Sequence, residues 1–163
     1  DGRLVVRDAT ARGQMEGAKQ HPQIEGRVQL RRVIADHDKR LYGLDVEPEG
    51  QVLVTSGATE ALTASIMGLV GQGDEIVLIE PSYDSYRPIA EAIGAVVKSV
   101  ILQQPRWRLT ENDLRAVIGQ KTAALLINTP LNPIGRGSDG AEHETLSRVA
   151  KETKAAVLCY GVI

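Results

Sequence analysis

The sequence predicts an α/β protein with a largely parallel sheet, and three observations support this prediction. Short apolar stretches alternate along the chain with stretches whose apolar residues have helical spacing. Each apolar stretch is continuous, which is typical of strands buried on both faces. Hydrophobic residues make up 42% and charged residues 25% of the 163 positions, as expected for a globular domain. We therefore expect three layers, with helices on both faces of a mostly parallel sheet.

The N-terminal region divides into an arm and a helix. Residues 1–22 show no periodic pattern, and we expect a poorly ordered arm ahead of an α/β region over residues 23–163. The apolar positions from Val28 to Tyr42 have approximately helical spacing, and Gly43 follows as a C-terminal stop. The helix is rich in arginine and lysine. It is either a nucleic-acid-binding surface or, as the interrupting Asp36 and Asp38 favour, an ordinary solvent-exposed face.

The remainder of the chain is predicted to alternate strands and helices. We expect five strands, at residues 52–55, 75–79, 96–101, 122–128 and 155–159. We expect helices at about 58–70, about 83–93, from Thr110 onward, and at about 142–153, with Thr110 and Asp113 spaced as a capping box. In open sheets of this kind ligands bind at the carboxyl ends of the strands. The loops that follow these strands are therefore the places to look for a site.

Composition and charge exclude several classes of function. A net charge of -2 and a pI near 6.0 argue against a nucleic-acid-binding or acidic-membrane-binding surface. No apolar run approaches the roughly 18 residues of a membrane span. The single cysteine, Cys159, excludes an internal disulfide and fits a reducing, cytoplasmic compartment. The three histidines show no metal-ligand spacing, so we expect no metal site.

The segment Ser56-Gly57-Ala58-Thr59-Glu60 joins a predicted strand to a predicted helix. Small residues let a ligand approach the backbone, and a helix start offers unpaired N–H groups to an anion. A phosphate can lie on the N–H groups of Ala58 and Thr59, with the Thr59 hydroxyl as a further donor. The alternative is a tight turn in which Ser56 or Thr59 only caps the helix. The spacing matches neither the G-x-G-x-x-G fingerprint nor a Walker loop.

Two other loops carry groups suited to a ligand. Tyr83, after the second strand, can lie flat against a planar ring, or it is a partly buried aromatic residue that fixes the turn. Residues 128–135, Asn-Thr-Pro-Leu-Asn-Pro-Ile-Gly, form a loop stiffened by two prolines. The Asn132 amide can donate to one ligand atom and accept from another, unless the loop serves rigidity alone.

Taken together, these segments resemble fold type I pyridoxal-phosphate aminotransferases of class I/II. The similar branch includes the kynurenine, methionine and N-succinyldiaminopimelate aminotransferases. The resemblance runs from about Lys19 to Val162, and its segments match in content, order and spacing: residues 25–31 (EGRVQLR), 52–62 (VLVTSGATEAL), 73–75 (GDE) with 80–86 (EPSYDSY), and 128–135 (NTPLNPIG). It covers nearly all of this chain but less than half of a complete family member.

The resemblance implies that residues 23–163 are part of the large, cofactor-binding domain. Ala58 and Thr59 would hold the phosphate of pyridoxal 5'-phosphate, and Tyr83 would stack on its pyridine ring. Asn132 would hydrogen-bond the ring oxygen near the substrate carboxylate. The complete protein would transfer an amino group between an amino acid and a 2-oxo acid as a cytoplasmic homodimer, with no nucleic-acid or membrane partner.

Several positions depart from the family pattern. His21 stands where the family has a tyrosine, and Ile134 replaces the threonine of an Asn-Pro-Thr-Gly turn. Tyr160 stands where the family has the aspartate that keeps the pyridine nitrogen protonated, and a phenol supplies no such charge at pH 7. None of the lysines has the Ser-x-x-Lys context of the Schiff-base lysine. We therefore assign no catalytic residue here, and expect this chain alone to be inactive and to bind the cofactor weakly or not at all.

The sequence leaves two other functions open. The C-terminal strand suggests either a fragment of a longer enzyme or a natural truncation. A non-catalytic remnant or pseudoenzyme, binding at most a phosphate-bearing ligand or a partner, would fit the departures at His21 and Tyr160. An ordinary nucleotide-binding domain is disfavoured because the glycine fingerprint is missing.

Overall fold

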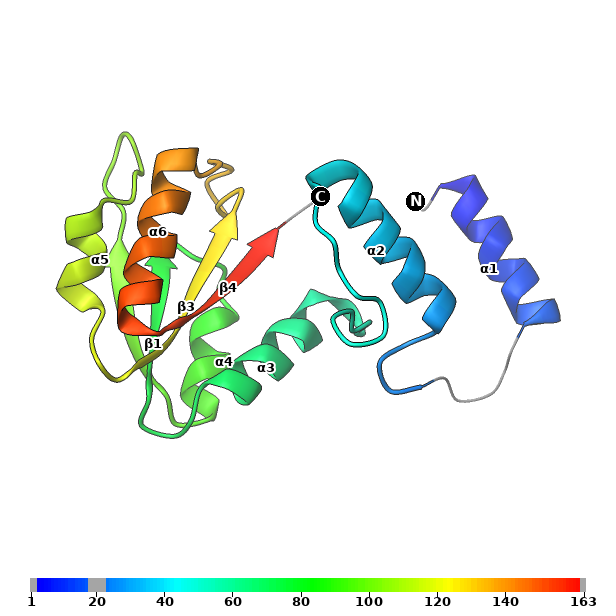
Figure 1. The fold of residues 1–163 in the computed structure, drawn as a ribbon, viewed down its shortest axis with the longest axis horizontal. Helices are drawn as coiled ribbons and strands as arrows, with labels where there is room; N and C mark the ends of the chain where they lie inside the picture. The colour runs from blue at the N-terminus through cyan, green and yellow to red at the C-terminus, as the bar shows by residue number, and fades with distance from the viewer. Residues whose placement is uncertain (1–2, 18–22, 162–163) are drawn as a thin grey trace. The chain divides into compact units, whose positions relative to one another are not determined.

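The structure is a computed structural model that describes residues 3–17 and 23–161. The chain forms two compact units, residues 1–55 and 56–163, each described below by itself. Figure 1 shows the helices and strands in chain order.

The first unit contains two helices. Helix α1 (Leu4–Glu16) forms where the sequence predicts no regular structure, and none of its residues is buried. Helix α2 (Val28–Tyr42) has the bounds expected from its apolar spacing, and Gly43 closes it in the left-handed conformation with φ 68°. Arg31 is 3% exposed, and its guanidinium donates to the Gln23 side chain and to backbone carbonyls of the loop after the helix. This arginine of α2 therefore ties the unit together, and does not belong to a basic surface.

The prediction of a strand at residues 52–55 is wrong, because no strand forms there in the described chain. The segment is extended, and the Val54 N–H donates to the Glu25 carbonyl at 3.0 Å. Gly26, with φ 93°, lies so close that a Cβ built on it would be 2.7 Å from Cβ of Val54. An apolar sequence favours the extended conformation, but a strand also needs a neighbouring strand to pair with.

The second unit is a three-layer α/β structure, as predicted. Its sheet is parallel throughout, with strand order β2-β1-β3-β4, and the strands are β1 (Glu75–Glu80), β2 (Val96–Ile101), β3 (Thr122–Thr129) and β4 (Ala156–Gly161). Its helices are α3 (Gly57–Leu69), α4 (Tyr86–Ala92), α5 (Glu111–Val117) and α6 (Gly140–Thr153). All four predicted strands of this unit form within two residues of their expected bounds.

Alternate residues of the central strands form two separate cores. Ile76 and Leu78 of β1 pack with side chains of α3 and α4, whereas Val77 and Ile79 pack with side chains of α5 and α6. Strand β3 divides its residues in the same way. Both faces of the sheet are thus covered by helices, which explains the continuous apolar runs in the sequence (Figure 1).

Two capping boxes fix the starts of α5 and α6. The sequence predicts the first, in which the Thr110 hydroxyl accepts from the Asp113 N–H and the Asp113 carboxylate accepts from the Thr110 N–H. The second, between Asp139 and Glu142, has the same reciprocal geometry and was not predicted.

Candidate functional site

The carboxyl end of β4 and the N-terminal turns of α3 line one pocket of about 270 Å³. Ala58 and Tyr160 both lie in its wall, and the other lining side chains are small or apolar. Because the strands are parallel, the loops after β1 and β3 begin at the carboxyl-terminal edge of the sheet, which is also where β4 ends. The candidate site is built on this edge.

The start of α3 exposes the backbone on which a phosphate is predicted to lie. Ser56 is the N-cap residue, yet its side chain makes no capping hydrogen bond. Ala58 and Thr59 are exposed in the first turn, where helical N–H groups have no acceptor within the helix. The Glu60 carboxylate reaches back to the Ser56 N–H. Its negative charge therefore lies beside the predicted phosphate position and opposes an anion there.

Tyr83 lies in the loop after β1 and is 44% exposed. Its ring meets the ring of Tyr86 edge-on, with 5.8 Å between centroids. The loop is held at its base, where Arg87 donates to the Glu80 carboxylate at 2.6 Å and to the Ser99 hydroxyl at 2.8 Å. Tyr83 is thus held in an anchored loop with nearly half of its surface exposed.

Tyr86 connects Tyr83 to the end of β4. It is 2% exposed, and its ring also meets that of Tyr160 edge-on at 6.3 Å. Burial, together with the phenols of Tyr160 and Tyr83, raises the pKa of Tyr86 to about 12. Among the described residues its hydroxyl has no hydrogen-bond partner. The three tyrosines form a continuous aromatic cluster.

Asn132 is exposed in the loop after β3, and the buried Asn128 at the end of β3 binds its backbone. The Asn132 N–H donates to Oδ1 of Asn128 at 2.9 Å. The other end of the Asn128 amide donates from Nδ2 to the backbone carbonyl of Tyr160 at 3.1 Å. Asn128 is 5% exposed, and it links the loop that carries Asn132 to the end of β4.

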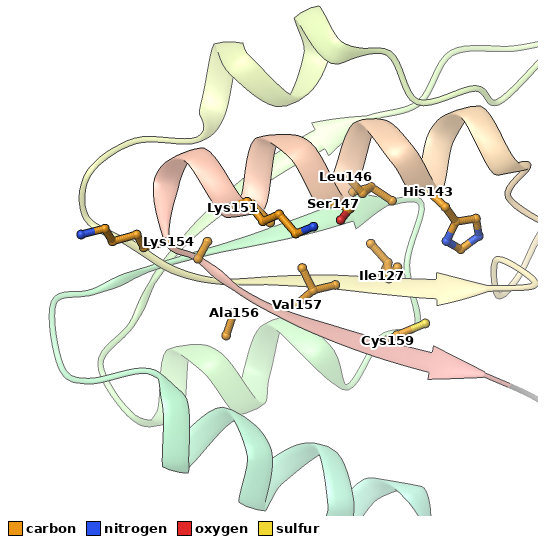
Figure 2. Close-up of a pocket in the computed structure, with 11 residues that line it drawn as sticks. Ile127, His143, Leu146, Ser147, Lys151, Lys154, Ala156, Val157 and Cys159 are labelled. Atoms are coloured by element: carbon orange, nitrogen blue, oxygen red, sulfur yellow. The ribbon is translucent and has the colours of Figure 1, made fainter. Parts of the chain in front are cut away.

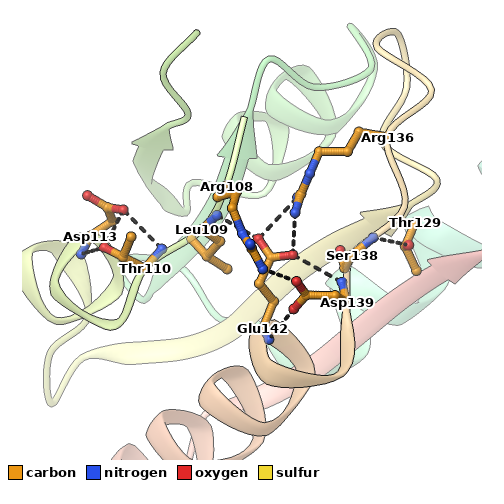
Figure 3. A network of polar contacts seen from close by, with 9 residues as sticks. All are labelled: Arg108, Leu109, Thr110, Asp113, Thr129, Arg136, Ser138, Asp139 and Glu142. Atoms are coloured by element: carbon orange, nitrogen blue, oxygen red, sulfur yellow. Dashed lines mark hydrogen bonds and ion pairs between the residues drawn. The ribbon is translucent and has the colours of Figure 1, made fainter. Parts of the chain in front are cut away.

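Arg136 and Glu142 hold the base of the same loop. An antiparallel bridge joins Leu131 to Arg136, and the Leu131 N–H donates to the Arg136 carbonyl at 2.7 Å. The Arg136 guanidinium then binds both oxygens of Glu142, at 3.0 and 2.5 Å. Figure 3 shows this carboxylate at the centre of the network, where it also accepts from the N–H groups of Leu109 and Asp139. One buried carboxylate thus joins the Asn132 loop to α6 and to the start of α5.

The charge of Glu142 is stabilised by its donors. Burial alone would raise its pKa, but the hydrogen bonds from Arg136 and the Leu109 N–H, with the charges of Arg136 and Arg108, lower it below the usual value. Arg108 itself forms an ion pair with Asp139 beside the carboxylate. Glu142 therefore remains ionised under ordinary conditions.

A second pocket, of about 520 Å³, lies between α6 and β4 (Figure 2). It is lined by apolar residues of both elements, with His143, Lys151 and Lys154 among its polar groups. Burial raises the pKa of Cys159 in its wall. None of the four predicted cofactor residues lines this pocket. It is therefore not part of the candidate site.

A chain of contacts links the four predicted residues within the second unit. Ala58, beside Thr59, shares a pocket with Tyr160. Tyr160 contacts Tyr83 through Tyr86, and it contacts Asn132 through Asn128. His21, the other departure from the family pattern, lies outside the described residues.

Sequence reasoning missed the residues that support the site: Asn128, Arg136 and Glu142. Asn128 could have been recognised as a polar residue that ends a buried apolar strand. The spacing of Asp139 and Glu142 is that of a capping box, but it gives no sign of the Arg136 contact.

Two features are absent from the described residues. No group of His, Cys, Asp and Glu side chains within residues 3–17 and 23–161 is arranged to hold a metal ion. In the same part of the chain, no helix is long and apolar enough to cross a membrane.

Comparisons with known proteins identify the family. Residues 3–159 match the family described as aminotransferase class I and II. A methionine aminotransferase of Escherichia coli (strain K12) is 38% identical over 133 residues, which are 82% of this chain and 34% of that protein. A probable N-succinyldiaminopimelate aminotransferase of Mycobacterium tuberculosis is 39% identical over 144 residues, covering 87% of this chain and 36% of that protein.

Solved structures agree with these matches. The crystal structure of an E. coli protein with a methionine aminotransferase function has a TM-score of 0.95 at 34% identity, covering 98% of this chain and 42% of that one. The structure of N-succinyldiaminopimelate aminotransferase from M. tuberculosis has a TM-score of 0.94 at 37% identity, with coverage of 98% and 42%. The chain spans about a third of the length of the curated relatives it matches. It belongs to the class I and II aminotransferases, the family of fold type I to which its sequence motifs point.

Proposed function

We propose that this chain forms the cofactor-facing part of an aminotransferase large domain. On this proposal residues 23–163 belong to that domain, and residues 1–22 form an arm before it. The complete protein transfers an amino group between an amino acid and a 2-oxo acid, as a cytoplasmic homodimer. Pyridoxal phosphate, when bound, supplies the electron-withdrawing ring on which the transfer takes place.

One observation carries the proposal. The start of α3, the aromatic cluster and the Asn132 loop are connected at one edge of the sheet, each through Tyr160. The donors suit the parts of the cofactor: backbone N–H groups for a phosphate, an exposed phenol face for a ring, and a side-chain amide for a ring oxygen. Ala58, Thr59, Tyr83 and Asn132 are the residues that would hold it.

The residues fit the cofactor less well at its ring nitrogen. None of the described residues that line the pocket beside Tyr160 carries a carboxylate. A protonated pyridine nitrogen would enter it without a counter-charge, and burial disfavours an unpaired charge. We therefore expect weak binding by this chain and assign no catalytic step to its own side chains.

A binding experiment tests the proposal without requiring activity. The probes are 4′-deoxypyridoxine 5′-phosphate, which has no aldehyde and cannot react with lysine, and inorganic phosphate. A ³¹P NMR titration should show tighter binding of the ring compound. Replacing Tyr83 or Asn132 with alanine should remove that advantage and leave phosphate binding unchanged. The control variant is Tyr42→Ala, because Tyr42 is 56% exposed in the first unit.

A second function is favoured by Tyr160 alone. A non-catalytic remnant or pseudoenzyme would keep a phosphate-binding α3 and lose the contacts to the ring. Equal affinity for the two probes, unaffected by Tyr83→Ala, would support this function and contradict the first.

A further inference from the structure

One buried side chain bonds to the backbone at two positions of the proposed site. The Asn128 amide accepts from the Asn132 N–H through Oδ1 and donates to the Tyr160 carbonyl through Nδ2. A backbone N–H can only donate and a carbonyl can only accept, so these two partners determine which way the amide faces. Asn128 and Tyr160 are also paired in the register of β3 and β4.

We propose that Asn128 is a positioning residue that sets the separation of Asn132 and Tyr160 without touching the ligand. This inference rests on the proposed function. With 5% of its surface exposed, Asn128 offers little surface to a bound ring, and both ends of its amide are already bonded to the backbone. Its two hydrogen bonds instead fix the backbone of Asn132, which is predicted to bind the ring oxygen, and of Tyr160, which would face the ring nitrogen.

The other supports of the loop act elsewhere. The bridge between Leu131 and Arg136 closes the base of the loop, and Glu142 holds that base to α6. The Ser138 N–H donates to the Thr129 hydroxyl at 3.1 Å, again at the base. Only the contact with Asn128, among these, reaches Asn132 itself. The contacts at the base therefore hold the loop closed without bonding to Asn132.

The isosteric variant Asn128→Asp separates the two bonds. An ionised carboxylate still accepts from the Asn132 N–H, but it cannot donate to the Tyr160 carbonyl and repels it. At pH 8 we expect affinity for 4′-deoxypyridoxine 5′-phosphate to fall about tenfold, the effect of losing one hydrogen bond of ordinary strength. Affinity for inorganic phosphate should not change, because the start of α3 is untouched.

Acidification should rescue the variant. A protonated aspartate has the same donor and acceptor pattern as asparagine, and burial raises its pKa toward the accessible range. The ratio of variant to wild-type affinity should therefore approach one as the pH falls toward 5. A residue that serves only general stability would show no such recovery. The matched control is Asn112→Asp, the same change at an exposed position of α5, and its ratio should stay at one.

The outcomes separate the inference from the function on which it rests. If Asn132→Ala weakens binding of the ring compound and Asn128→Asp does not, the positioning role is wrong and the proposed function stands. If the wild-type chain binds the ring compound no better than phosphate, the function fails and the inference fails with it. If Asn128→Asp does not fold, amide exchange in the wild type decides. Slow exchange at Asn132 supports the role, and exchange as fast as in an open loop overturns it.

Discussion

Replacing Glu142 with glutamine should destabilise the second unit. Each carboxylate oxygen accepts two hydrogen bonds: Oε1 from Leu109 and Arg136, and Oε2 from Asp139 and Arg136. A glutamine must place its NH₂ group at the position of one of these oxygens. There it faces two N–H donors and can accept from neither. The variant therefore loses two hydrogen bonds and the charge that compensates Arg136.

The magnitude follows from the burial of this pair. The side chain of Glu142 is 4% exposed and that of Arg136 is 22% exposed, so solvent replaces few of the lost bonds. Hydrogen bonds to a charged group contribute roughly 1.5–3 kcal/mol each, and removing one member of a buried ion pair costs roughly 3–5 kcal/mol. We expect Glu142→Gln to lower the free energy of unfolding by about 3 kcal/mol.

Urea unfolding followed by Trp107 fluorescence measures this loss, because the single tryptophan packs against the core between the sheet and α5 and α6. Because the free energy of unfolding falls by roughly 1–3 kcal/mol per molar of urea, the urea concentration at the unfolding midpoint should fall by about 1–3 M. The control is Glu144→Gln, an exposed change on the same helix, which should shift unfolding by less than about 0.5 kcal/mol. If the two variants unfold alike, the Glu142 network does not stabilise the unit.

The pH dependence gives an independent check of the same network. The pKa of Glu142 is lower in the folded chain than in the unfolded one, so its contribution is present above the unfolded pKa, roughly 4.3. It is lost as the pH falls through the folded pKa. The difference between wild type and Glu142→Gln should therefore be constant near neutral pH and shrink in acid. A difference that grows in acid would contradict the assigned charge.

Four other predictions concern the site. Gly57→Val should abolish phosphate binding in ³¹P NMR and lower the melting temperature: at φ 82° a β-branched residue costs about 1–3 kcal/mol in backbone strain, although a Cβ there meets no atom within 4 Å. Thr59→Ala should weaken phosphate binding only about twofold, because the backbone donors remain. Tyr86, with its pKa raised to about 12, should ionise only at strongly alkaline pH in an ultraviolet titration, and stability should fall as the pH rises from about 10 to 12; Tyr86→Phe should remove that late step. Borohydride reduction after incubation with pyridoxal phosphate should label several lysines sub-stoichiometrically, and full labelling of one lysine would refute the absence of a Schiff-base lysine.

The fold of the second unit could be predicted because each element carries its own local signal. The run at residues 122–128 is too apolar for any place but the centre of a sheet, and Thr110 with Asp113 marks the start of α5. The same reasoning failed at residues 52–55, where pairing depends on a partner strand that the segment itself does not determine. It also missed α1, whose residues lack a buried face and so show no amphipathic period.

The site could be predicted only in part, for a related reason. Tyr83 and Asn132 follow strand ends, and the topology of a parallel sheet brings such positions to the same end of the sheet, whereas Ala58 follows an extended segment that is not part of the sheet. The supporting contacts join residues far apart in sequence, such as Asn128 with Tyr160 and Leu109 with Glu142. Nothing in the local sequence of either partner specifies these pairs, because they arise from the packing of β3, β4 and α6.

Tyr160 shows why fold and chemistry must be argued separately in this chain. Its backbone carbonyl binds Asn128, its strand keeps parallel register with β3, and its ring packs edge-on against Tyr86. All three contacts are made by the backbone or by an uncharged ring, and none of them needs a carboxylate. The fold therefore accepts a phenol at the position where the sequence resemblance predicts an aspartate. The reaction is more demanding, because a neutral phenol cannot offset a positive charge on a ring nitrogen at pH 7. A substitution that costs the structure little can thus remove a charge on which the chemistry depends, and measurements of stability alone would not reveal the loss.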